Sequence, residues 1–180
     1  MRPDSLRFLT SFAVNHRRTL QQGDIKNAFC NSDLPPDKVT IVCPPIGDPD
    51  ILKNEYWLLC KTLYGLRRSL QHWFNKIDSI FKSMGLEPNL YDPCLYSGFI
   101  QDPSNPADTA TLLPITIGLY VDDFVYFSKD PAVEAKFEKI LSSQVPVDFM
   151  GTGEWFLGIH FTWDKSDDGH LSIRLCAKSR

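Results

Sequence analysis

The feature that most constrains the fold is a pair of adjacent acids inside a long apolar stretch. Residues 117–127 read IGLYVDDFVYF, with Asp122 and Asp123 between two runs that both favour burial. An Asp pair is common at a solvated turn, where it costs nothing. The flanking residues, however, are apolar on both faces of the expected strands, which is typical of strands in the centre of a sheet. The pattern predicts a hairpin with two like charges at the edge of the core.

Two neighbouring carboxylates in such a place repel each other, and the repulsion raises a pKa unless a cation or hydrogen-bond donors neutralise them. Mg²⁺ prefers oxygen ligands and keeps its remaining positions for water and substrate phosphates. Two such ions about 4 Å apart stabilise the attacking and leaving oxygens in phosphoryl transfer. Such a site normally needs a further carboxylate from elsewhere in the chain.

Asp24 is the best candidate for that further carboxylate. It lies at the end of a strand expected over residues 19–25, directly before a short helix expected over 26–32, where backbone N–H groups can bind a triphosphate. The alternative role for Asp24 is a helix N-cap. The other acids considered lie in Pro-rich turns or in a polar loop: Asp33, Asp37, Asp48, Asp50, Asp167 and Asp168.

The totals indicate one globular domain, since the chain has 180 residues of which 43% are apolar. The net charge of −3 argues against an indiscriminate nucleic-acid binder, so phosphate contacts would need a local basic patch or bridging metal ions. The five cysteines are widely spaced, and no secretory segment or 18-residue apolar run is present. We expect a soluble intracellular protein with reduced thiols and no membrane contact; whether it is cytoplasmic or nuclear stays open.

The densest positive run is residues 61–76, KTLYGLRRSLQHWFNK, which contains no acid. Aromatic residues among cations suit stacking on bases beside a phosphate backbone. The alternative is a solvated helix face with Trp73 and Phe74 in the core, which their helical spacing favours. Arg67 and Arg68 are the better phosphate candidates, although ordinary surface charge explains them equally well.

Hydrophobic periodicity and capping residues predict a mixed order of helices and strands. Helices are expected over residues 4–16 and 69–84 and from Asp130–Pro131 onward, with a surface loop at 101–111. Strands are expected at residues 19–25, 38–43, 56–64, 94–100, on both sides of the Asp pair, and at 154–164 and 170–176. This order indicates an α+β fold, an antiparallel sheet with helices packed on one face.

Five sequence blocks, in order, resemble the reverse transcriptase of copia-type retrotransposons. The blocks are QGDIKNAFCNSDL, CKTLYGLRRSLQHWF, LYDPCLY, LYVDDFVYF and GEWFLGIHF. The first resembles that family's first catalytic block, the fourth its Tyr-Val-Asp-Asp loop, and the last its primer grip. The resemblance spans nearly the whole chain. It implies a single domain fragment over residues 1–180, a reverse-transcriptase palm with part of the fingers, without the upstream fingers, thumb or ribonuclease H domain.

The resemblance also implies an activity, RNA-directed DNA polymerase, in which a primer 3′-hydroxyl attacks the α-phosphorus of a deoxynucleoside triphosphate. Asp24, Asp122 and Asp123 match the catalytic, metal-binding carboxylates, which would hold two Mg²⁺ ions, with Mn²⁺ able to substitute. The implied partners are an RNA or DNA template, a DNA primer, the triphosphate, and the rest of the retrotransposon polyprotein with its ribonuclease H and integrase.

Further positions match the family's binding segments. Phe29 matches the aromatic residue that blocks a ribose 2′-hydroxyl; core packing is the alternative for this residue. A hydrophobic strand with a bulge glycine is the alternative for residues 156–158. The implied nucleotide-binding residues are Ile25, Lys26, Asn27, Phe29, Tyr64 and Gly65. The implied template and primer residues are Arg67, Arg68, Phe156, Leu157 and Gly158.

The chain also departs from the family pattern. Leu70 replaces a proline, and Gln71 replaces a cation that would contact template or nucleotide. With part of the fingers missing, we expect weak binding of primer–template and poor polymerisation by the isolated chain. Two alternatives stay open: a non-catalytic transposon remnant that acts at most as an interaction module, and a metal-dependent phosphohydrolase or nuclease.

Overall fold

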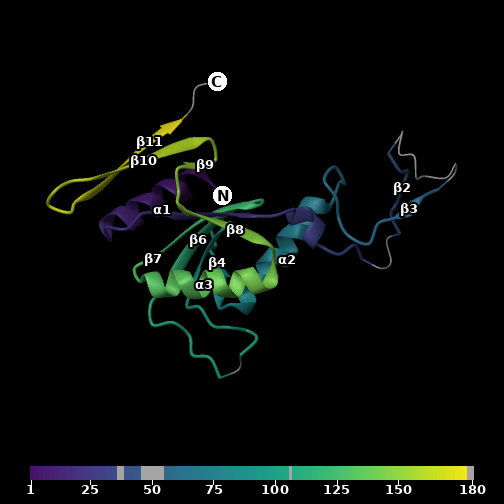
Figure 1. Ribbon diagram of the computed structural model, residues 1–180, viewed down its shortest axis with the longest axis horizontal. Coiled ribbons are helices and arrows are strands. Elements are labelled where there is room, and N and C mark those ends of the chain that lie inside the picture. Colours follow the sequence, from purple (N-terminus) through teal and green to yellow (C-terminus); the bar gives the residue numbers. More distant parts are fainter. Residues whose placement is uncertain (36–38, 46–54, 106, 178–180) are drawn as a thin grey trace. The chain divides into compact units, whose positions relative to one another are not determined.

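The structure, a computed structural model, describes residues 1–35, 39–45, 55–105 and 107–177. It divides into two compact units. We call Met1–Lys26 with Asp78–Arg180 the sheet unit, and Asn27–Ile77 the inserted unit. Figure 1 shows the elements of both units along the sequence.

The sheet unit is built on six strands in the order β4-β5-β6-β7-β1-β8, and all neighbouring strands are antiparallel. The strands are β1 (Gln21–Ile25), β4 (Leu86–Pro88), β5 (Leu95–Gly98), β6 (Ile115–Tyr120), β7 (Asp123–Ser128) and β8 (Val147–Thr152). The predicted hairpin at the Asp pair is confirmed, since β6 and β7 pair on both sides of it. Because β1 lies between β7 and β8, the end of β1 is next to that hairpin.

Helices cover both faces of this sheet, so the expectation that they pack on one face is wrong. Helix α1 (Pro3–Asn15) packs through Phe12 on Phe127, with ring centroids 5.6 Å apart. Helix α3 (Pro131–Gln144) packs through Phe137 on Phe124 and Tyr126, at 6.1 and 5.2 Å. Figure 1 shows α1 and α3 on opposite sides of the strands. The reason is that β7 is apolar on both faces, and each face must be covered.

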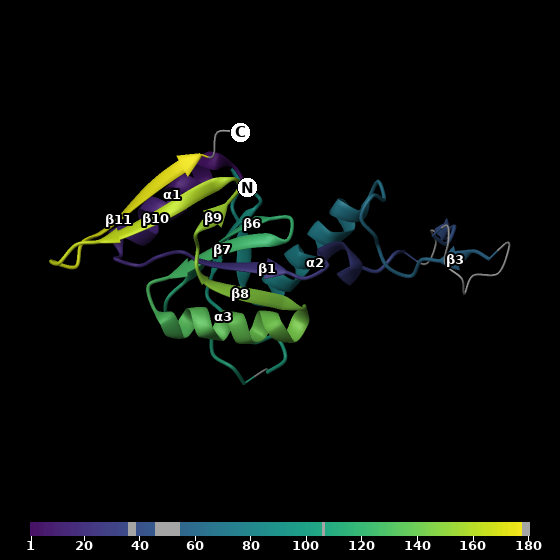
Figure 2. The same cartoon turned by 45° about the horizontal axis from the view of Figure 1, so that its top comes forward.

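A second sheet adds to the layer that contains α1 (Figure 2). Its strands are β9 (Trp155–Phe156), β10 (Ile159–Lys165) and β11 (Leu171–Ala177), in the order β11-β10-β9. Phe156 and Phe161 are buried in one cluster with Leu6 and Leu9 of α1. The predicted hairpin between residues 164 and 170 is confirmed by the pairing of β10 with β11.

Helix α2 (Ser69–Ser83) begins in the inserted unit and ends in the sheet unit. It confirms the helix expected over residues 69–84, and Gly85 follows it with φ +86°. The hydroxyl of Ser69, the first residue of α2, donates a hydrogen bond to the Leu63 carbonyl. Asp130 does cap α3, by accepting a hydrogen bond of 2.9 Å from the Ala132 N–H. Within the described ranges, no helix is long and apolar enough to cross a membrane.

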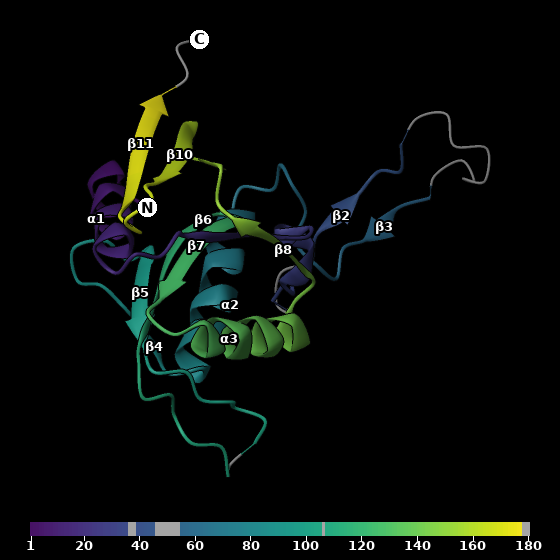
Figure 3. The same ribbon diagram turned by 60° about the vertical axis from the view of Figure 1, so that its left-hand side comes forward.

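In its described residues, the inserted unit has little regular structure beyond the start of α2. It contains the 3₁₀ helix η1 (Ala28–Asn31) and the antiparallel pair β2 (Ile41–Val42) and β3 (Trp57–Leu58), shown in Figure 3. The strands expected over residues 38–43 and 56–64 are therefore only two residues long, and residue 38 lies outside the described residues. Both residues of β3 are exposed, so this ribbon has no buried face that would extend its pairing.

Candidate active site

Three acids lie side by side across three neighbouring strands of the sheet unit. Asp24 of β1 is directly opposite Asp123 of β7 and, on its other side, directly opposite Asp148 of β8. Residues directly opposite in antiparallel strands point to the same face, with Cβ atoms about 4.5–5.5 Å apart. The register thus places an acid from the start of the chain beside the Asp pair of the late hairpin.

Asp122 lies in the turn between β6 and β7. Tyr120 pairs with Asp123, so the turn consists of Val121 and Asp122 alone. Val121 has φ +60°, a conformation that a β-branched residue rarely adopts. The Ile25 N–H donates a hydrogen bond of 2.9 Å to the Asp122 carbonyl. This bond ties the turn to β1, so the strained backbone is held in place, as is common at functional sites.

The electrostatics of this edge are those of crowded carboxylates. Burial is the largest cause that raises the pKa of Asp24. The negative charges of Asp122 and Asp148 raise this pKa further, and the positive charge of Lys26 lowers it. Burial likewise raises the pKa of Asp123, with further contributions from Asp122 and Asp24. The four acids therefore form one repelling group on which a bound cation would act favourably.

Sequence reasoning missed Asp148, and it placed Lys26 among the nucleotide-binding residues. The two side chains form an ion pair of 2.7 Å, and both are about half exposed. The Lys26 N–H also donates to the Pro146 carbonyl, at 2.9 Å. No motif marks Asp148, and the only signal for it is the pairing of β8 with β1, which lies about 120 residues earlier in the chain.

The side chains of the site suit a divalent metal ion by their donor atoms, but their arrangement does not yet form a complete metal site. The donors are carboxylate oxygens, the ligands that Mg²⁺ prefers. In the ranges that the structure describes, however, no three Asp, Glu, His or Cys side chains converge closely enough to hold a metal ion. The register fixes the backbone positions of Asp24 and Asp123, so convergence at these two positions depends on rotation of the side chains.

The expected nucleotide-binding residues Asn27, Phe29, Tyr64 and Gly65 all belong to the inserted unit. The rings of Phe29 and Tyr64 lie 4.5 Å apart at 59°. Asn27 and Gly65 both have left-handed backbone, with φ +50° and +90°. Phe29 and Tyr64 therefore contact each other, and the roles of these four residues in nucleotide binding stay predictions.

The expected primer-grip residues lie at the turn between β9 and β10. Phe156 is only 2% exposed and belongs to the core under α1. Leu157 and Gly158 have φ of +54° and +73°, as in the tight turns that match the twist of a hairpin. Phe156 therefore has a structural role, and Gly158 alone of the three is exposed at the turn.

Comparison with known proteins identifies the family. The model of the family described as reverse transcriptase (RNA-dependent DNA polymerase) matches residues 1–177. The chain belongs to this family. The candidate active site of this chain is the row formed by Asp24, Asp123 and Asp148, together with Asp122 of the turn.

The relatives of this reverse transcriptase chain are transposon polyproteins. It is 28% identical over 162 residues to the retrovirus-related Pol polyprotein from transposon TNT 1-94 of Nicotiana tabacum. This match covers 90% of the chain and 11% of that relative. It is 28% identical over 145 residues, 80% of this chain, to the truncated transposon Ty1-A and the transposon Ty1-DR5 Gag-Pol polyproteins of Saccharomyces cerevisiae. Those matches cover 11% and 7% of the two yeast proteins, so the chain spans about a tenth of its relatives or less. No solved structure matches the chain.

Proposed function

We propose that the sheet unit is the palm, and the inserted unit part of the fingers, of an RNA-directed DNA polymerase encoded by a copia-type retrotransposon. The observation that carries the proposal is the register of β1 with β7, which sets Asp24 opposite Asp123 beside the strained turn with Asp122. Membership of the reverse transcriptase family supports this assignment.

In this proposal Asp24, Asp122 and Asp123 hold two Mg²⁺ ions, or Mn²⁺ in their place. When bound, such ions stabilise the charge on the attacking and leaving oxygens of nucleotidyl transfer. The role of the carboxylates would be to hold these ions, so they have to stay ionised, although burial and mutual repulsion raise the pKa of Asp24 and of Asp123.

The remaining roles follow from the same proposal. Lys26, at the end of β1, exchanges its ion pair with Asp148 for the triphosphate. Phe29 excludes a ribose 2′-hydroxyl, and Arg67 and Arg68 contact the template. The rest of the polyprotein supplies the other contacts to primer and template, so we expect the isolated chain to bind primer–template weakly.

Single-nucleotide primer extension tests the proposal. The full chain, in excess over an RNA template with a DNA primer, should add one deoxynucleotide slowly in Mn²⁺ or Mg²⁺. Asp122→Asn should lower the rate by at least about 100-fold, since it removes charge from the site. Asp167→Asn, which removes a carboxylate from the exposed turn after β10, is the matched control and should leave the rate unchanged.

Other outcomes would contradict the proposal. Nucleotide incorporation that persists in Asp122→Asn would mean that these carboxylates do not take part in the reaction. Phosphate release or strand cleavage without incorporation would indicate a nuclease or phosphohydrolase. A chain that neither incorporates nucleotides nor binds Mn²⁺ would be a non-catalytic remnant.

A further inference from the structure

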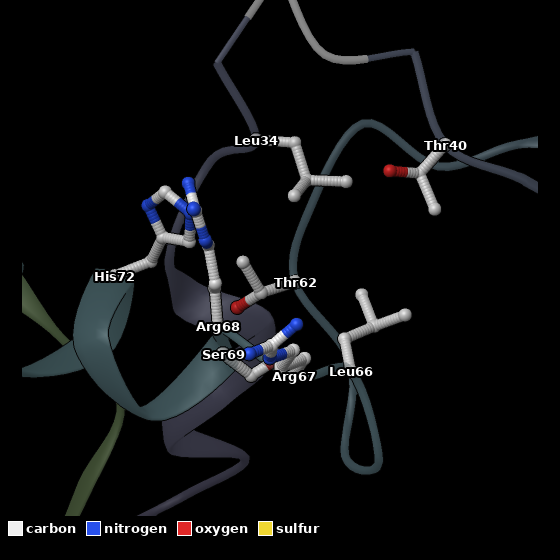
Figure 4. A pocket seen from close by; sticks show the side chains of 8 residues that line it. All are labelled: Leu34, Thr40, Thr62, Leu66, Arg67, Arg68, Ser69 and His72. Atoms are coloured by element: carbon white, nitrogen blue, oxygen red, sulfur yellow. The ribbon is translucent and has the colours of Figure 1, made fainter.

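Two pockets are lined by arginines, and they differ in what the proposed function explains. Figure 4 shows the pocket of the inserted unit, whose Arg67 and Arg68 are already proposed to contact the template. A larger pocket, of about 450 Å³, lies in the sheet unit and has no role in the proposed function. Its volume is within the range of about 300–1,000 Å³ that is typical of small-molecule sites.

The pocket of the sheet unit lies between two segments that are distant in the chain. Residues 17–19 and Gln21 line it from the segment that joins α1 to β1. Lys165, Gly169 and Leu171 line it from the hairpin of β10 and β11. Figures 1 and 2 both show the end of α1 and the loop of this hairpin on the same side of the sheet unit.

This pocket is separate from the candidate active site. Gln21 is the first residue of β1, and Asp24 follows three residues later, which is about 10 Å along an extended strand. The four acids of the candidate active site are not in the lining of the pocket. A ligand in the pocket would therefore not need the metal ions of that site.

The lining of the pocket carries positive charge that the protein does not compensate. Among the described residues, no salt bridge reaches Arg17 or Lys165, and both side chains are exposed. Arg18 is paired with Glu134, which offsets its charge. No acid among the described residues lines the pocket. Two cations, those of Arg17 and Lys165, therefore remain for a ligand.

The acids of the hairpin do not line this pocket either. Asp168 accepts hydrogen bonds from the Ser166 hydroxyl and the His170 N–H within the hairpin loop. Asp164 precedes Lys165 in β10, and successive side chains of a strand point to opposite faces. The face of β10 that carries Lys165 is therefore not the face that carries Asp164.

The fold accounts for only one of the two unpaired cations. Arg17 follows the C-terminal end of α1, which is partly negative and favours a cation. Its φ is +55°, a conformation in which glycine is the usual residue, so an arginine here costs stability. Lys165 comes from a different element, and no helix end explains it. Like charges from distant segments repel in one pocket, and an anion between them would relieve the repulsion.

The donor groups of the pocket suit phosphate. A guanidinium binds phosphate oxygens through two N–H groups at once, and an ammonium adds a compact charge. Among the described residues, the side-chain hydrogen bonds of Arg18 reach Glu134 alone, although a guanidinium has five N–H donors. Two unpaired cations and these spare donors match two phosphate groups better than one. Leu171, which is only 6% exposed, offers an apolar wall to an organic group.

We propose that this pocket binds a small ligand with two linked phosphate groups, a nucleoside diphosphate or a molecule of the same chemistry, with its phosphates at Arg17, Arg18 and Lys165. The inference goes beyond the proposed function, because it assigns an anion site that takes no part in nucleotidyl transfer. A nucleic-acid strand also presents successive phosphates, and the experiment separates the two sources.

Isothermal titration calorimetry with inorganic pyrophosphate tests the proposal, with the full chain in EDTA so that no divalent metal contributes. The parent chain should bind pyrophosphate saturably, and Arg17→Gln/Lys165→Gln should bind it at least about tenfold more weakly, because hydrogen bonds to charged groups are lost. The control Lys139→Gln/Arg174→Gln removes the same charge from two exposed positions outside the lining and should bind like the parent chain. Circular dichroism establishes that each variant is folded.

ADP, inorganic phosphate and a 12-nucleotide strand of mixed sequence are titrated in the same way. Binding of ADP that weakens in Arg17→Gln/Lys165→Gln supports the proposal, as does weaker binding of phosphate than of pyrophosphate. Phosphate that binds as tightly as pyrophosphate would overturn the assignment of two phosphate groups. A strand that binds more tightly than ADP at equal phosphate concentration, and loses this affinity in Arg17→Gln/Lys165→Gln, would overturn the assignment of a small ligand.

Three further outcomes would overturn the proposal as a whole. They are no saturable binding of pyrophosphate by the parent chain, equal affinity of the parent chain and Arg17→Gln/Lys165→Gln, and an equal loss of affinity in Lys139→Gln/Arg174→Gln. Because no divalent metal is present, each of these results leaves the polymerase proposal to be judged by primer extension alone.

Discussion

Acids occur in two very different settings within the sheet unit. Glu134 of α3 is only 5% exposed, and its carboxylate accepts hydrogen bonds from the Arg18 guanidinium and from the Ser128 N–H, the latter at 3.0 Å. Glu138 of the same helix accepts a hydrogen bond of 2.6 Å from the Tyr126 hydroxyl. Burial and this bond raise the pKa of Tyr126, so the phenol remains a donor.

The acids where β1 ends and β7 begins are in a different setting, in which only Asp148 has an ion-pair partner among the described residues, Lys26. Among the described residues, no side-chain hydrogen bond or salt bridge reaches Asp24, Asp122 or Asp123, and the nearest charges around Asp24 are mostly other carboxylates. The comparison shows that the acids which hold the fold are neutralised by the protein itself. The raised pKa values of Asp24 and Asp123 indicate that these acids repel one another, which is expected of groups that bind a cation.

The largest effect on stability is expected from breaking the buried pair of Arg18 and Glu134. Arg18→Met should lower the free energy of unfolding by about 3 kcal/mol, because it leaves a buried charge with one partner fewer. Chemical denaturation measures this loss. The double variant Arg18→Met/Glu134→Gln removes both charges and retains an acceptor for the Ser128 N–H, so it should recover more than half of the stability. A loss of less than about 1 kcal/mol in the single variant would mean that the pair is not a structural element.

A smaller change in stability, of opposite sign, is expected when Asp24 at the end of β1 is replaced. The pKa of Asp24 is raised above its unfolded value of 3.8, so the folded state binds this proton more tightly than the unfolded state does. The contribution of Asp24 to stability is therefore greatest at acid pH and is lost as the pH rises from about 4 through the raised pKa. Asp24→Asn should stabilise the chain at pH 7 by about 0.2–1 kcal/mol, the cost of like charges on neighbouring strands.

Calorimetry in EDTA measures this gain as a rise in Tm of about 0.4–4 °C. At a pH of about 3.5 the gain should disappear, since the carboxyl group is then largely protonated in both states. A Tm that falls at pH 7 in Asp24→Asn would show that the carboxylate makes a stabilising contact and would erase the difference between the two settings.

The sequence predicts well those elements whose signals are local. The helical spacing that ends at Gly85, the cap at Asp130 and the apolar runs around Asp122 and Asp123 each determine their own structure within about 15 residues. The order of the motifs predicts that Asp24 lies near the Asp pair. The register of β1 with β7 places Asp24 directly opposite Asp123.

The misses depend on partners that are distant in the chain. Strand β8 is an edge strand in which Val147, Phe149 and Met150 are apolar but no residue is buried. Asp148 is identified only by the pairing of β8 with β1. The prediction that all helices pack on one face of the sheet is wrong. The residues of β7 are apolar on both faces, and this pattern requires cover on both faces. In the inserted unit, runs with strand propensity form only two-residue strands because no core face selects them.

Binding of Mn²⁺ tests most directly the claim that the acids where β1 ends and β7 begins are kept for a cation. The full chain, Asp122→Asn and Asp167→Asn are each titrated with Mn²⁺ at pH 7. Electron paramagnetic resonance measures the concentration of free Mn²⁺ at each step. The account predicts saturable binding that is at least about tenfold weaker in Asp122→Asn and unchanged in Asp167→Asn. Equal affinity in all three proteins, or no saturable binding by the parent chain, would contradict it.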